Sequence, residues 1–184
     1  MGKENHKFQY KEVENGGRAQ KYYSSIDWLV NADIMYLSKL ETAIRFDLED
    51  YARDDFFRAY TSDLSLLMAM RDFSLKRHIV ENTLEGNIKG GVYECAVADS
   101  LHKSGYQLYF YKNETSRREL DFIVQKDGNV VPIEVKSSNS RSNSLSAVLK
   151  ANESIPFGYK FIDGNVGGGE DRIITLPLYM ASFV

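Results

Sequence analysis

An Asp-Gly pair between two apolar runs is the feature that most limits how this chain of 184 residues can fold. Asp127 and Gly128 separate residues 119–125 (ELDFIVQ) from residues 130–136 (VVPIEVK). Asp-Gly between apolar runs is the strongest short-range signal for a β-hairpin. We therefore predict two antiparallel strands over 119–125 and 130–136, joined by a two-residue turn.

The predicted turn also fixes which residues face each other across the hairpin. If its two residues are unpaired, counting back along both strands sets Asp121 directly opposite Glu134. Like charges in such positions destabilise a sheet, so the pair favours a cation such as Mg²⁺, which takes oxygen ligands. Lys136 lies two residues beyond Glu134 and shares its face. The alternative is that these residues form only the solvated face of a strand.

A fourth charged group comes from a helix that we predict over residues 91–104. Glu94 shares a helical stripe with Val97, Ala98 and Leu101, the spacing expected of a face that packs against a sheet. An acid on such a stripe is costly to bury without a partner, and a metal ion is one such partner. A surface ion pair or a helix cap would equally explain Glu94.

Apolar patterns elsewhere predict a mixed α/β protein in three parts. Residues 1–20 are polar and form a flexible lead-in, residues 21–75 form a smaller, mainly helical part, and residues 76–184 form the α/β domain. Further helices are predicted at 22–31, at 54–70 (one or two helices) and near 144–151, and further strands at 34–37, 107–112 and 157–163.

Composition limits the function classes. The single cysteine, Cys95, allows no intramolecular disulfide and fits a reducing cytoplasm. No apolar run approaches the length of a membrane helix, so no membrane partner is expected. The net charge of −3 gives no general argument for nucleic acid. Residues 101–160 carry nine Lys or Arg against six Asp or Glu, a local bias that solvated surfaces also explain.

These residues resemble the PD-(D/E)xK nuclease superfamily, with Glu94 on a helix, Asp121 on one strand and Glu134-Val135-Lys136 on its partner. An ordered set of phrases resembles, more narrowly, the C-terminal domain of unknown function that follows AAA+ ATPase modules in bacteria and archaea. The phrases are FRAYTSD (57–63), GVYE (91–94), ELDF (119–122), PIEVK (132–136), SL (144–145) and LPLYM (176–180).

The resemblance implies a restriction-endonuclease-like mixed sheet flanked by helices. It also implies that residues 21–75 are the remnant of a winged-helix segment. No Walker A motif occurs in the chain, so the ATPase module that such domains accompany would be supplied elsewhere.

The resemblance also implies roles for the candidate residues. Asp121 and Glu134 would bind Mg²⁺ or Mn²⁺ together with the carbonyl group of Val135, and Glu94 would support a second ion or the water shell. Lys136 would orient the attacking water and stabilise negative charge on a DNA phosphate. The alternative is a catalytically silent module that binds DNA or protein on behalf of an ATPase, so the sequence leaves enzyme activity open.

Overall fold

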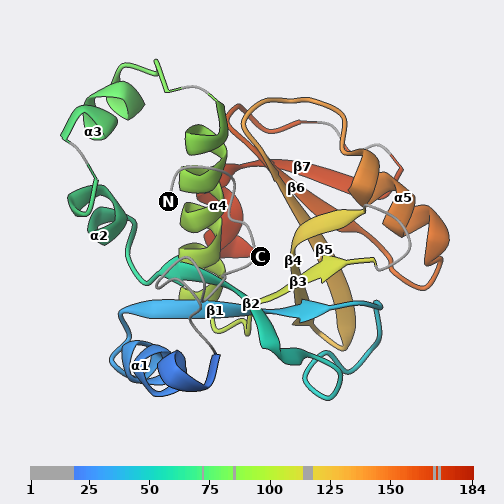
Figure 1. Cartoon of the computed structure of the whole chain (residues 1–184). Helices are drawn as coiled ribbons and strands as arrows, with labels where there is room; N and C mark the ends of the chain where they lie inside the picture. Colours follow the sequence, from blue (N-terminus) through green and yellow to red (C-terminus); the bar gives the residue numbers. More distant parts are fainter. Residues whose placement is uncertain (1–18, 72, 85, 114–117, 168, 170) are drawn as a thin grey trace.

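Seven strands form one mixed sheet at the centre of the computed structural model, which describes residues 19–71, 73–84, 86–113, 118–167, 169 and 171–184 (Figure 1). The spatial order is β2-β1-β3-β4-β5-β6-β7. Neighbours are antiparallel for β2–β1, β3–β4 and β4–β5, and parallel for β1–β3, β5–β6 and β6–β7. The strands are β1 (Met35–Glu41), β2 (Arg53–Thr61), β3 (Tyr109–Lys112), β4 (Glu119–Lys126), β5 (Asn129–Lys136), β6 (Gly158–Ile162) and β7 (Ile173–Pro177).

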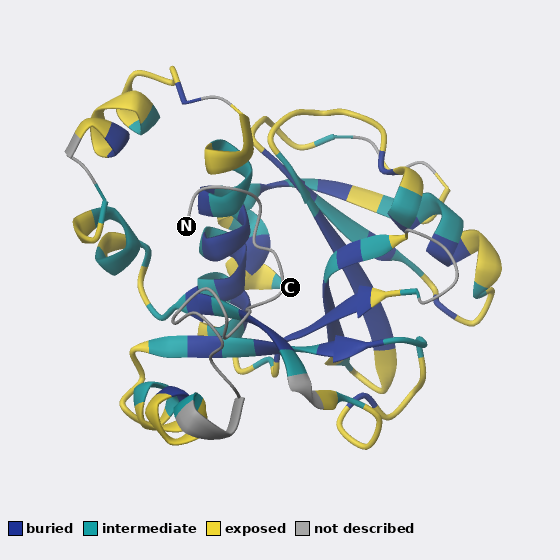
Figure 2. Cartoon of the chain, in the orientation of Figure 1, coloured by how far each residue is buried: buried dark blue, intermediate teal, exposed yellow. Residues whose placement is uncertain are grey.

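Helices cover both faces of this sheet, which confirms the mixed α/β class. On one face, α4 contributes Val97, Ala98 and Leu101 to a core with Phe122 and Ile133. On the other face, side chains of α5 pack into a second core. The strand residues that contribute to these two cores are buried (Figure 2). The helices are α1 (Ala19–Asn31), α2 (Leu64–Ala69), α3 (Phe73–Val80), α4 (Gly86–Lys103), α5 (Asn143–Ala151) and a 3₁₀ helix, η2 (Leu178–Phe183).

The hairpin predicted from the Asp-Gly pair is confirmed. Lys126 pairs with Asn129, and the register continues without a shift to Phe122 opposite Ile133. Asp127 and Gly128 have φ angles of 48° and 74°. Positive φ at both central residues is typical of the tight turn whose twist matches that of the strands it joins. The local sequence thus sets both the turn and the register of β4 against β5.

A β-bulge in β4 is a feature that the sequence pattern did not predict. Pairing with β3 shifts between Tyr109 and Tyr111, so that Asp121 and Phe122 together lie opposite Phe110. A bulge leaves one extra residue on its strand and re-aims the side chains next to it. Strict alternation therefore fails at Asp121, one of the predicted site residues.

The helices predicted over residues 54–70 are wrong for the first half of that segment. β2 runs from Arg53 to Thr61, and only Leu64–Ala69 is helical. The aromatic residues of this stretch fit a strand as well as a helix, and pairing with β1 decides between them. Residues 21–75 therefore contribute two strands, β1 and β2, to the main sheet in addition to their helices.

The other predicted elements are present with shifted ends. The helices at 22–31, 91–104 and 144–151 correspond to α1, α4 and α5, and the strands at 34–37, 107–112 and 157–163 to β1, β3 and β6. Most of the predicted lead-in, residues 1–18, lies outside the described residues. Within the described part of the chain, no helix is long and apolar enough to cross a membrane.

Gly158, the first residue of β6, has no room for a side chain. A Cβ atom there would lie 2.8 Å from Cδ1 of Leu145 and 2.9 Å from the carbonyl oxygen of Pro132. We expect Gly158→Ala to lower the free energy of unfolding by about 1–3 kcal/mol, as overpacking does. In α4, a Cβ at Gly91 meets nothing within 4 Å, so Gly91→Ala should be stabilising by up to about 1 kcal/mol. Urea denaturation of both variants measures this, and a Gly158→Ala variant as stable as the parent would contradict it.

Candidate functional site

A polar cleft of about 510 Å³ contains all of the residues predicted to form a site. It lies where the start of α4 meets the ends of β4 and β5. Three different elements supply the predicted residues, since Glu94 comes from α4, Asp121 from β4, and Glu134 and Lys136 from β5. The charged side chains that line the cleft are Arg58, Glu94, Glu119, Asp121, Glu134 and Lys136.

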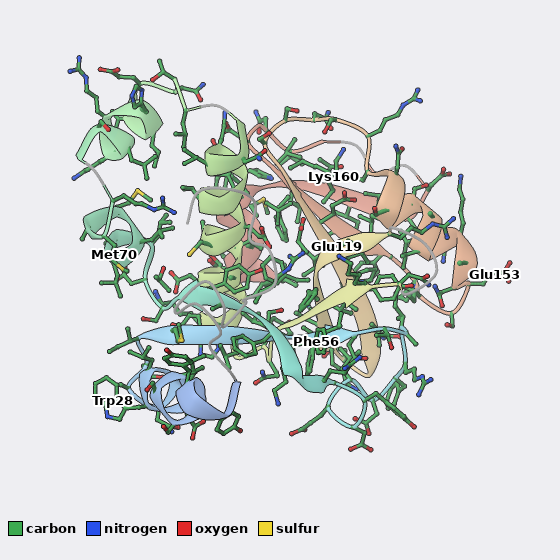
Figure 3. All side chains as sticks on the ribbon, viewed as in Figure 1. Trp28, Phe56, Met70, Glu119, Glu153 and Lys160 are labelled. Atoms are coloured by element: carbon green, nitrogen blue, oxygen red, sulfur yellow. The ribbon has the colours of Figure 1, made fainter. Side chains whose placement is uncertain are left out.

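One group of bonded charges forms around Arg58 on the α4 face of the sheet. Nη1 of Arg58 donates to Oε1 of Glu94 at 2.6 Å and lies 3.7 Å from Oδ1 of Asp121. Nη2 donates to Glu119, the first residue of β4, which is labelled in Figure 3. Tyr60, two residues along β2, donates its hydroxyl to the same Oε1 of Glu94 at 2.7 Å. A single buried cation thus contacts three carboxylates.

A second group forms around Glu134 on the α5 face. Oε1 of Glu134 lies 2.6 Å from Nζ of Lys136, and Oε2 accepts a hydrogen bond from the backbone N–H of Leu145 at 3.3 Å. Leu145 is in the first turn of α5, where unpaired N–H groups and the helix dipole favour a carboxylate. The preceding residue, Ile133, packs into the α4 core. Glu94 and Glu134 therefore approach the cleft from opposite faces of the sheet.

Asp121 links the two groups. Its Oδ2 accepts a hydrogen bond from the backbone N–H of Val135 at 2.7 Å, while Oδ1 faces Arg58. We predicted a simple cross-strand pair of Asp121 with Glu134. In the structure the bulge turns Asp121 toward the α4 face, and its carboxylate binds the β5 backbone one residue beyond Glu134.

Burial disfavours the charged forms of Glu94 and Asp121. Burial, and next the charge of Asp121, raise the pKa of Glu94 to about 7 despite the contact with Arg58. Burial also raises the pKa of Asp121, although Arg58 and the N–H of Val135 lower it. Burial alone would lower the pKa of Arg58, but Tyr60 and the surrounding acids raise it, so this guanidinium stays charged. An additional cation nearby would favour the charged form of both carboxylates and lower the pKa of each.

Sequence reasoning missed Arg58, Tyr60 and Glu119 as members of the site. Arg58 and Tyr60 occur in the phrase FRAYTSD and Glu119 begins the phrase ELDF, both of which carried the family resemblance. Reading residues 54–61 as a helix hid the signal. On a strand, Arg58 and Tyr60 are two residues apart and so point to the same face.

The donor set suits a hard divalent cation, because carboxylate and carbonyl oxygens are the ligands that Mg²⁺ prefers. Among the residues that the structure describes, however, no three His, Cys, Asp or Glu side chains are grouped so as to hold a metal ion. The acids contact cations of the chain instead: Glu94 and Asp121 face Arg58, and Glu134 faces Lys136.

Residues 89–179 match a family described as a domain of unknown function, DUF4143. The matched range includes Glu94, Asp121, Glu134 and Lys136, and it excludes Arg58 and β2. Comparison with curated proteins gave no match, and neither did comparison with solved structures.

The raised pKa of Glu94 makes stability depend on pH. In the metal-free protein Glu94 holds its proton up to about pH 7, whereas an ordinary Glu loses it near 4.5. The folded state binds more protons in this window, so the free energy of unfolding should fall as pH rises from 4.5 to 7. Glu94→Gln should remove this part of the slope, at most about 3 kcal/mol.

Urea denaturation at several pH values with a metal chelator measures that slope. Glu81→Gln, which removes an exposed acid just after α3, is the matched control and should keep the parent slope. An unchanged slope in Glu94→Gln would show that the carboxyl of Glu94 titrates without the predicted shift.

Asp121→Asn should raise the stability of the metal-free protein at neutral pH by up to about 1 kcal/mol. Burial disfavours the charged form of Asp121, and an amide oxygen still accepts the N–H of Val135. Thermal melts in the presence of a chelator test this. Asp127→Asn in the hairpin turn, where Asn-Gly is as suitable as Asp-Gly, should be neutral. A lower melting temperature for Asp121→Asn would mean that its attraction to Arg58 outweighs its burial.

Proposed function

We propose that this chain is a nuclease-like domain of the PD-(D/E)xK type, which cleaves DNA phosphodiester bonds with Mg²⁺ or Mn²⁺ and works beside an AAA+ ATPase module. One observation carries the proposal: Glu94, Asp121, Glu134 and Lys136, which come from three elements, line a single polar cleft. Convergence of two carboxylates and a lysine at the ends of paired strands is the arrangement that such chemistry requires.

The architecture supports the restriction-endonuclease-like part of this proposal. The antiparallel strands β3, β4 and β5 are followed by the parallel strands β6 and β7, with α4 on one face and α5 on the other. In the same proposal, α1 and the antiparallel pair β1–β2 would be the remnant of a winged-helix segment. Fold alone does not establish activity, so the argument depends on the site.

The roles follow from the contacts in the cleft. Asp121 and Glu134, with the carbonyl of Val135, would hold the ion, and Glu94 would hold water around it. When bound, Mg²⁺ or Mn²⁺ polarises a phosphate oxygen and lowers the pKa of water. The side chain of Lys136 is 33% exposed while its Nζ contacts Glu134. It can therefore contact the site and an incoming phosphate together, where it would orient water and stabilise developing charge.

A specific observation also favours the second candidate, a catalytically silent module that binds DNA or protein. Each of the three acids already has a partner within the chain: Arg58 for Glu94 and Asp121, and Lys136 for Glu134. An arrangement of this kind can serve the fold alone. The two candidates differ in what removal of Lys136 does to cleavage, which makes that residue the decisive probe.

We expect slow, weakly sequence-selective nicking of supercoiled plasmid with Mg²⁺ or Mn²⁺, abolished by Glu134→Ala and reduced about 100-fold by Lys136→Ala. Nicking should be slow because a net charge of −3 gives little non-specific affinity for phosphates. Gel analysis of nicked and intact plasmid measures the rate. Lys150→Ala removes an exposed lysine of α5 that is not part of the cleft and should nick like the parent.

Two outcomes would count against the enzyme. Equal rates for Lys136→Ala and the parent would show that the activity comes from a contaminant. Failure to cleave supercoiled DNA, linear DNA or RNA with either metal would make the binding module the better description.

A further inference from the structure

Arg58 enters the cleft from the edge of the sheet. It belongs to β2, the edge strand, which β1 and β3 separate from β4. Its guanidinium lies 4.6 Å from the centre of the Phe110 ring on β3, and only 4% of the residue is exposed. The side chain therefore extends over the neighbouring strands to contact acids on β4 and α4. A buried charge that contacts acids on other elements calls for an explanation.

The two terminal nitrogens of Arg58 contact different kinds of acid. Nη1 lies between Glu94 and Asp121, at 2.6 Å and 3.7 Å, and both acids belong to the proposed ligand set. Nη2 donates to Glu119, which is outside that set. Nε is buried and has no hydrogen-bond partner among the described residues. Nη1 thus lies within 4 Å of Asp121, a proposed direct ligand, and of Glu94, which would hold the water shell, so its positive charge would be close to a bound divalent ion.

These contacts indicate that, in the metal-free protein, the guanidinium of Arg58 takes the place of a metal cation. Two neighbouring carboxylates repel each other, and Nη1 of Arg58 is a cationic group within 4 Å of both Glu94 and Asp121. Removing one partner of a buried ion pair leaves the other charge uncompensated. In the metal-free protein Arg58 is therefore the group that holds Glu94 and Asp121 together.

We propose that Arg58 is a built-in counter-ion that competes with a divalent metal ion for Glu94 and Asp121, and so sets the metal affinity of the cleft. The inference depends on the proposed function only in assuming that a divalent ion binds at Asp121 and Glu134. When the ion binds, Nη1 moves away from Glu94 and Asp121, while Nη2 keeps its hydrogen bond to Glu119. The retained hydrogen bond limits the free-energy cost of moving Nη1 away from the two acids.

A purely structural arginine makes the opposite prediction. If Arg58 only fixes the positions of the acids, its removal disorders them and weakens metal binding. If Arg58 competes with the metal, its removal strengthens metal binding, because a positive charge within a few ångströms of the ion is lost. The sign of the change in affinity therefore separates the two roles.

Titration calorimetry of the full chain with MnCl₂ measures this sign. We expect Arg58→Gln to bind Mn²⁺ about tenfold more tightly than the parent, with a larger increase in melting temperature on adding Mn²⁺. Arg77→Gln removes an exposed arginine paired with Glu81 and should leave the affinity unchanged. Equal or weaker binding by a folded Arg58→Gln variant would overturn the proposal.

A second measurement applies if Arg58→Gln fails to fold. In the parent protein labelled with ¹⁵N-arginine, the guanidinium resonances of Arg58 should shift on titration with Mg²⁺ and saturate with the binding isotherm. Arg58→Lys, which keeps a charge but cannot bridge three acids, assigns the resonances. Saturating Mg²⁺ that leaves these resonances in place would overturn the proposal equally.

The results also separate this inference from the proposed function. Binding that Asp121→Asn abolishes but Arg58→Gln leaves unchanged would remove the inference and keep the metal site. Binding that Arg58→Gln strengthens, without any nicking, would keep the inference and remove the nuclease. If neither the parent nor Arg58→Gln binds Mn²⁺, both proposals fail.

Discussion

Carboxylates gathered in a partly buried cleft repel each other and lose hydration, and basic side chains around the cleft offset that cost. Glu94, Glu119 and Asp121 come from α4 and β4, yet a single cation from β2 contacts all three. The ion pairs therefore fasten the edge of the sheet to its centre and to the helix above it. On the other face, Glu134 gains Lys136 and the first turn of α5. Buried pairs of this kind add little net stability, so their retention is easier to explain by a function for the acids than by the fold.

Local signals predicted much of the fold, and long-range ones account for what was missed. The turn at Asp127 and Gly128 determines its own geometry, so the register from Lys126–Asn129 to Phe122–Ile133 could be counted from the sequence. The bulge at Asp121 depends on how β4 meets β3, which no neighbouring residue encodes. The strand β2 was mistaken for a helix for a similar reason. Its apolar spacing fits both periods, and the pairing with β1 that decides the matter is a tertiary contact.

For the site as well, local patterns predicted some residues, and tertiary contacts account for those that were missed. Alternation correctly placed Glu134 and Lys136 together on one face of β5, and helical spacing correctly turned Glu94 toward the sheet. Neither pattern could show that the helix and the lysine lie on opposite faces, because each describes a single element. Arg58 could not be found at all from spacing, since its partners lie on α4 and β4, far along the chain. The sequence feature that points to Arg58 is its position two residues before Tyr60, which places both side chains on the same face of a strand.

The position of Arg58 bears on which part of the chain is the working unit. The range that matches the domain of unknown function begins at residue 89, after β1 and β2. That range holds the candidate ligands and the lysine, but the cation that faces two of them comes from outside it. Without β1, the strand β3 would also become an unpaired edge with buried aromatic residues, a site at which other chains can add. Residues 89–179 alone would therefore present both a less neutralised acidic cluster and an open sheet edge. The strands β1 and β2 extend the sheet beyond β3 and supply the Arg58 cation to the cleft, so the folded unit around the cleft is larger than the matched range.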